Sequence, residues 1–75
     1  MRVGKITDYD KLVIIAQTYS YINGAFTPRQ LLLFIQKYNY KFHSEISQRR
    51  ITQNLKRSSK FDMIKNGKTI KFEAI

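Results

Sequence analysis

The sequence predicts one small α+β domain, residues 1–75, in which three helices precede a C-terminal β-hairpin. Apolar residues recur at helical spacing in three segments, and two segments of alternating character flank Asn66-Gly67 near the end of the chain. The net charge is +9, and nine of the 14 basic side chains lie between residues 41 and 71. Because an excess of this size attracts polyanions, the later half of the chain is predicted to face one.

Composition excludes several classes of site. The chain has no cysteine, so it forms neither a disulfide framework nor a thiolate zinc site. With 43% hydrophobic residues it can still build a core. Its longest apolar runs have five residues, whereas a membrane-spanning helix needs about 20. The first residues lack a secretory apolar stretch, so we expect an intracellular, cytoplasmic protein without membrane association.

The first helix is predicted over residues 8–22. Thr7 can cap it, and Asp8 and Asp10 lie where the helix dipole favours negative charge. Gly24 follows its end. The core-facing stripe at helical spacing consists of Leu12, Ile15, Ala16, Tyr19 and Ile22.

The second helix is predicted over residues 28–39. Thr27, Pro28 and Gln30 have the spacing of a capping box with proline at the first helical position. Just before it, Ala25-Phe26 is long enough only for a brief pairing with a sheet edge. The apolar face of this helix comprises Leu31, Phe34, Ile35 and Tyr38.

The segment from Tyr38 to Phe42 has two interpretations. Its alternating aromatics could form a strand on which unpaired bases stack, or it could be a helix end that runs into a loop. We favour the helix end, because Tyr38 already completes an apolar stripe and no second aromatic strand is near in the sequence.

The third helix, predicted over residues 45–57, carries most of the functional signal. Ser47 can cap it, with Ser44 as a rival, and Ile51 and Leu55 form a narrow apolar stripe. A basic surface helix usually mixes glutamate with lysine, but no carboxylate interrupts the outer face here. Its side chains suit guanine, adenine and phosphate. They are Arg49, Thr52, Gln53 and Lys56, flanked by Arg50 and Arg57.

The hairpin is predicted over residues 61–73. Asn-Gly favours a two-residue type I′ turn, which would place Lys65 opposite Lys68 and Asp62 opposite Lys71. Two lysines facing each other repel, which favours a tip that meets an anion. In this register one apolar face comprises Phe61, Met63, Ile70 and Phe72.

The order of three helices, a basic third helix and a hairpin with a basic tip resembles the winged helix-turn-helix superfamily of DNA-binding domains. The resemblance implies that "SQRRITQNLKR" enters the major groove of DNA and that "IKNGKT" is the tip of a wing on the neighbouring backbone. It assigns base contacts to Arg49, Thr52 and Gln53. It assigns backbone contacts to Ser44, Ser47, Arg50, Lys56, Arg57, Lys65, Asn66 and Lys68. The expected function is that of a small transcriptional regulator on double-stranded DNA.

Many members of this superfamily dimerise through an additional terminal helix, and no such helix is predicted among residues 1–75. A homodimer is therefore predicted through apolar positions that lie off the core-facing stripes. These positions are Ile14 and Tyr21 in the first helix, and Leu33 and Tyr40 in or after the second.

The sequence also bears on three other functions. His43 is the only histidine, and no arrangement of nucleophile and base or of metal ligands accompanies it, so we expect neither an enzyme nor a metal or cofactor site. Binding of RNA or single-stranded DNA through the aromatics of residues 38–42 is an alternative. A protein-interaction module is another, which the polar outer face of residues 45–57 disfavours.

Overall fold

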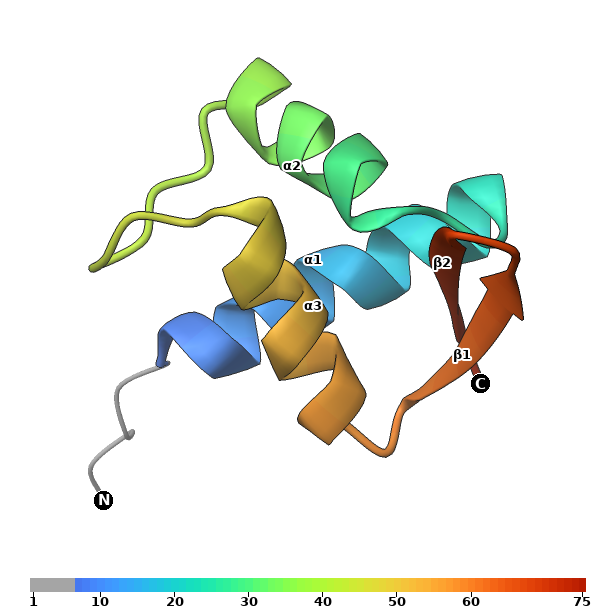
Figure 1. The fold of residues 1–75 in the computed structure, drawn as a ribbon. Coiled ribbons are helices and arrows are strands. Elements are labelled where there is room, and N and C mark those ends of the chain that lie inside the picture. Colours follow the sequence, from blue (N-terminus) through green and yellow to red (C-terminus); the bar gives the residue numbers. More distant parts are fainter. Residues whose placement is uncertain (1–6) are drawn as a thin grey trace.

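The computed structural model describes residues 7–75 and contains five elements (Figure 1). They are the helices α1 (Asp8–Asn23), α2 (Pro28–Lys37) and α3 (Gln48–Arg57), and the strands β1 (Phe61–Asn66) and β2 (Thr69–Ala74). The strands form one antiparallel hairpin. The predicted α+β class, with three helices followed by a hairpin, is confirmed.

The helices surround one core. Both α1 and α2 contact α3, and the hairpin packs against all three helices, with β2 on α1 and α2 and β1 on α3. In Figure 1, α3 crosses in front of α1, and the hairpin stands beside the C-terminal end of α1. The largest fully buried side chains are Phe26, Phe72, Leu12, Leu31, Ile51 and Leu55.

Each helix begins at a predicted capping residue. The Thr7 hydroxyl accepts a hydrogen bond from the backbone N–H of Asp10 (3.1 Å), and Thr27 and Gln30 form both bonds of a capping box (2.9 and 3.2 Å). These caps satisfy N–H groups that have no partner within the helix.

The third helix starts later, and the second ends earlier, than predicted. Ser47 is the cap of α3, because its hydroxyl accepts from the backbone N–H of Arg50 (3.2 Å). The helix therefore begins at Gln48 and not at residue 45. At the end of α2, Asn39 has a positive φ of 54°, a conformation that ends a helix.

The segment after α2 is a helix end that runs into a loop, as favoured from the sequence. One detail is wrong, however: Tyr38 lies beyond the last residue of α2 and is 56% exposed. Its ring instead packs at the surface, 4.9 Å from that of Phe34 between centroids.

The predicted apolar stripe of α1 holds from Leu12 to Tyr19 and fails at Ile22. Leu12, Ile15 and Ala16 are buried and Tyr19 is partly buried against the core, whereas Ile22 is 74% exposed. Near its C-terminus the helix turns a different side toward the hairpin. There the buried Ser20 hydroxyl accepts a hydrogen bond from the backbone N–H of Ala74 (2.9 Å).

The hairpin register differs from the prediction. Asn66 pairs with Thr69 and Phe61 with Ala74, so the two loop residues are Gly67 and Lys68. Gly67 has a φ of 63°, and a glycine at the first loop position is typical of a type II′ turn. Each residue of β1 pairs with a residue two positions further along β2 than predicted, so the predicted pairs are wrong. Because the shift is an even number of positions, the predicted residues still share each face of the hairpin.

Two consequences of this register correct the prediction. Asp62 lies opposite Glu73 and not opposite Lys71, so the expected cross-strand charge pair is absent. On the apolar face Phe61 and Phe72 are buried, but Met63 remains exposed.

Phe26 explains the register. Its backbone N–H donates to the carbonyl of Phe72 (2.9 Å), and the N–H of Phe72 donates back (2.7 Å), so the predicted brief pairing of this segment is confirmed. The Phe26 ring also meets that of Phe61 edge to face, with centroids 6.3 Å apart. These contacts place Phe72 opposite Met63, which leaves Gly67-Lys68 as the turn.

From Thr7 to Ile75, the structure contains no helix that is both long and apolar enough to cross a membrane.

Candidate nucleic-acid interface

The candidate interface is the outer face of α3. Ile51 and Leu55 are almost completely buried on the inner face, which fixes the rotation of the helix about its axis. Arg49, Gln53 and Lys56 consequently lie on the exposed side, at the i, i+4, i+7 spacing that aligns side chains along one face. None of these three makes a hydrogen bond or ion pair through its side chain within residues 7–75.

Two arginines predicted to lie beside this face turn toward α1 instead. The Arg50 guanidinium is 3.8 Å from the Asp8 carboxylate and donates weakly to the carbonyl of Glu45 (3.5 Å). Arg57 lies over the ring of Tyr9, 5.6 Å from its centroid, a distance at which a cation–π attraction acts. Both side chains therefore hold α3 against α1.

Three hydroxyl-bearing residues of the predicted site have roles within the fold. The Thr52 hydroxyl donates to the carbonyl of Gln48 (2.9 Å), which leaves its lone pairs and its methyl group for other contacts. The Ser47 hydroxyl caps α3. Ser44 donates its backbone N–H to Asp8 (2.9 Å) and is exposed.

Asp8 is a structural centre that the sequence prediction missed. Its carboxylate is buried and accepts the backbone N–H groups of His43 (2.8 Å) and Ser44 (2.9 Å), and the Nδ1 atom of His43 lies 3.2 Å away. With Arg50 on the same carboxylate, Asp8 joins the start of α1 to the connection before α3. An acidic residue in a first helical turn is explained by the helix dipole alone, so no separate signal in the sequence indicates this role.

These contacts make stability depend on pH. Hydrogen bonding from the backbone of His43, followed by that of Ser44 and the charge of the imidazole, holds the pKa of Asp8 below its ordinary value of 3.8, against the opposing effect of burial. A carboxyl group with a lowered folded-state pKa stabilises the fold above the unfolded value. That contribution is lost as the pH falls through the folded value.

We expect Asp8→Asn to lower the melting temperature at pH 7 and to reduce its dependence on pH below 4. The amide NH2 of asparagine would face the backbone N–H of His43 or of Ser44, leaving a partly buried N–H group unsatisfied. Thermal melts followed by circular dichroism between pH 2 and 7 measure both effects. Asp10→Asn is the matched control, because it removes the same charge from the same helical turn at an exposed position. Equal melting curves for the two variants would refute this role of Asp8.

The hairpin tip carries the second part of the candidate interface. Lys65, Asn66 and Lys68 are all exposed, as the prediction requires. The lysines do not face each other, however, because Lys65 pairs with Ile70 and Lys68 lies in the loop. The tip therefore presents two separate cations.

The residues predicted to form a dimer are exposed. Ile14, Tyr21 and Leu33 each expose more than half of their surface, and Tyr40 exposes 40%. Ring contacts join Tyr40 to Phe34 at a centroid distance of 5.9 Å. The homodimer through these positions stays a prediction, which sedimentation velocity at micromolar concentrations tests.

Within residues 7–75, no three His, Asp or Glu side chains are grouped so that they could hold a metal ion. His43 exposes most of its side chain and contacts Asp8.

A scan of the chain against protein-family models finds no match, and neither a search of curated proteins nor one of solved structures finds a similar chain.

Proposed function

We propose that this protein is a winged helix-turn-helix domain that binds double-stranded DNA and regulates transcription. In this proposal α3 enters the major groove, with Arg49, Gln53 and Thr52 toward base edges and Lys56 toward phosphate. The hairpin is the wing, with Lys65, Asn66 and Lys68 on the adjacent backbone.

One observation carries the proposal. Ile51 and Leu55 bury the inner face of α3 in the core. Its exposed face carries Arg49, Gln53 and Lys56, and the helix contains no acidic residue. Arginine reads guanine and glutamine reads adenine through paired hydrogen bonds in the major groove. A net charge of +9 supplies the attraction to phosphate that is independent of sequence.

The internal contacts of Arg50 and Arg57 refine the proposed roles. A guanidinium that already binds a carboxylate or stacks on a ring has fewer donors free for DNA. We therefore infer that these two arginines position α3, and that phosphate contacts come mainly from Lys56 and the wing.

Fluorescence anisotropy tests the proposal. The protein is titrated against a labelled random duplex pool and a matched single strand at salt concentrations from about 50 to 200 mM. We expect tighter binding to the duplex, with a slope of log K against log [salt] of about −4 to −5, corresponding to roughly five neutralised phosphates. Equal or tighter binding to the single strand would contradict it.

A second candidate function is binding of single-stranded RNA or DNA. Tyr38 and Tyr40 are exposed, and Lys37 and Lys41 adjoin them in the chain. Aromatic rings beside cations can stack bases and contact phosphates. If the single strand binds more tightly, and Tyr40→Ser removes that binding without unfolding the protein, this candidate replaces the first.

The wing makes a separate prediction. Lys65→Ala and Lys68→Ala should each weaken binding to every duplex by a similar factor and reduce the magnitude of the salt slope by about 1. Lys37→Ala is the control, because this lysine lies at the end of α2 and not in the wing. Salt titrations of all three variants on two unrelated duplexes give the slopes. An unchanged slope for both wing variants would exclude their contact with phosphate.

A further inference from the structure

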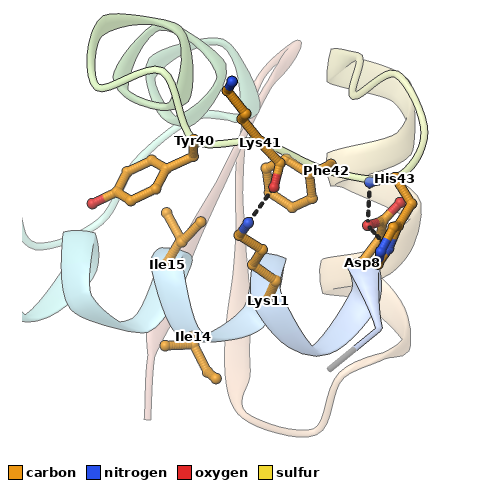
Figure 2. Close-up of a pocket in the computed structure, with 8 residues that line it drawn as sticks. All are labelled: Asp8, Lys11, Ile14, Ile15, Tyr40, Lys41, Phe42 and His43. Carbon is orange, nitrogen blue, oxygen red and sulfur yellow. Dashed lines mark hydrogen bonds and ion pairs between the residues drawn. The ribbon is translucent and has the colours of Figure 1, made fainter. Parts of the chain in front are cut away.

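A groove lies between α1 and the segment that connects α2 to α3 (Figure 2). Its volume is about 540 Å³, within the range of roughly 300–1,000 Å³ that is common for small-molecule sites. None of the residues assigned above to contact with duplex DNA lines it, although Tyr40 and Lys41 also belong to the second candidate surface. The lining residues are Asp8, Lys11, Ile14, Ile15, Tyr40, Lys41, Phe42 and His43.

The walls are mainly apolar. Ile14 and Ile15 come from α1, and Tyr40 and Phe42 come from the connecting segment on the opposite side. Phe42 is partly buried against the core, so this wall has a fixed position. An apolar body of a few carbon atoms would therefore be removed from water on two sides.

A single ammonium group projects into this space. Figure 2 shows the side chain of Lys11 rising from α1 between the two walls, where its Nζ atom donates to the backbone carbonyl of Lys41. Nζ lies 5.3 Å from the centroid of the Phe42 ring. An ammonium has three donors, and the Lys41 carbonyl accepts one of them.

No carboxylate of the described chain neutralises Lys11. Asp8, the one acidic residue that lines the groove, is engaged by His43, Ser44 and Arg50, and residues 7–75 place no acidic oxygen within 4.0 Å of Lys11. The groove thus combines apolar walls with a positive charge that has no counter-ion among these residues.

We propose that this groove binds small amphipathic monocarboxylates. The carboxylate accepts hydrogen bonds from the Lys11 ammonium, and the apolar chain or ring lies between Ile15 and the rings of Tyr40 and Phe42 (Figure 2). A neutral apolar molecule would desolvate the ammonium without a compensating partner, and a cation would be repelled by it. A second copy is the rival occupant, because Ile14 and Tyr40 are also positions of the predicted homodimer. A symmetric dimer at this groove would bring the Lys11 and Lys41 side chains of both copies together, which like-charge repulsion disfavours.

The probe is octanoate, with octanol and octylammonium as the neutral and cationic counterparts. Each is added to the 15N-labelled protein, and amide and side-chain resonances are followed by NMR in the absence of DNA. We expect saturable shifts at Ile15, Tyr40 and Phe42 with octanoate. The two counterparts should bind at least about tenfold more weakly, because only octanoate offers the Lys11 ammonium an acceptor of opposite charge.

Two variants test the assigned contacts. Lys11→Met keeps an unbranched side chain, shorter by one atom, and removes the charge, and it should weaken octanoate binding at least about tenfold. Lys37→Met, outside the groove, should leave it unchanged. If Lys11→Met does not fold, Tyr40→Ser at the exposed wall should weaken binding while the fold is retained.

Several results would overturn the proposal. They are an equal affinity for octanol, an unaltered affinity of the Lys11→Met variant, or octanoate shifts confined to other parts of the surface. Shifts of the groove resonances on raising the protein concentration without octanoate would show that a second copy occupies the groove instead. Because DNA is absent from the experiment, its outcome is independent of the proposed DNA binding.

Discussion

Phe26→Ala should lower the free energy of unfolding by about 3–5 kcal/mol, the range for truncating a buried phenylalanine. Small domains are stable by only about 5–15 kcal/mol, so much of this variant should be unfolded under mild conditions. The ring of Phe26 is fully buried and contacts Tyr19, Phe61 and Phe72. Its loss would leave a cavity where α1, the start of α2 and the hairpin meet.

Chemical denaturation followed by circular dichroism measures this effect. Tyr21→Ala is the matched control, because it also removes an aromatic ring, from a position that is 66% exposed. Its free energy of unfolding should change by no more than about 0.5 kcal/mol. A Phe26 variant as stable as this control would mean that the segment between α1 and α2 does not hold the hairpin.

Arg49→Ala and Gln53→Ala should each lower discrimination between a preferred duplex and a scrambled one by about 1–3 kcal/mol, or roughly 5- to 150-fold in relative affinity. Each side chain is exposed on the outer face of α3 and makes no competing hydrogen bond in residues 7–75. A bidentate contact to a base edge is lost completely when such a side chain is truncated.

The experiment needs a preferred duplex, obtained by selection from the random pool, and a scrambled duplex of the same composition. Lys56→Ala on the same helix is the control, since loss of a phosphate contact should weaken both duplexes alike. If Arg49→Ala and Gln53→Ala also weaken both duplexes by the same factor, neither residue reads bases.

The helices could be predicted because their signals are local. The hydroxyls of Thr7, Thr27 and Ser47 each accept from an N–H three residues later, so a cap is visible in a short stretch of sequence. The rival caps of α3 were settled only by the fold, which uses the backbone N–H of Ser44 to bind Asp8.

The hairpin register could not be predicted from its own residues. Asn66-Gly67 alone favours the register in which these two residues form the turn. The observed register also satisfies Phe72, whose backbone pairs with Phe26 far away in the chain. The free energy of such a tertiary contact outweighs the small difference in free energy between two turn types. The residues of the hairpin alone do not indicate this contact.

Helical periodicity predicted the exposed side of the candidate interface but not the side that faces α1. Arg49, Gln53 and Lys56 lie on the outer face as the spacing of Ile51 and Leu55 requires. Arg50 and Arg57 were predicted to lie beside this face and to contact phosphate, because nothing local shows that α1 supplies a carboxylate and a ring to receive them.

The contacts of Asp8 also bear on conformational entropy. The connection between α2 and α3 contains no helix or strand, and such a segment ordinarily retains backbone freedom that any binding partner must remove. One buried carboxylate already restrains two consecutive backbone N–H groups there, at His43 and Ser44. The segment that leads into α3 is thus ordered before any partner binds. The conformational entropy of this segment is lost on folding and not on binding.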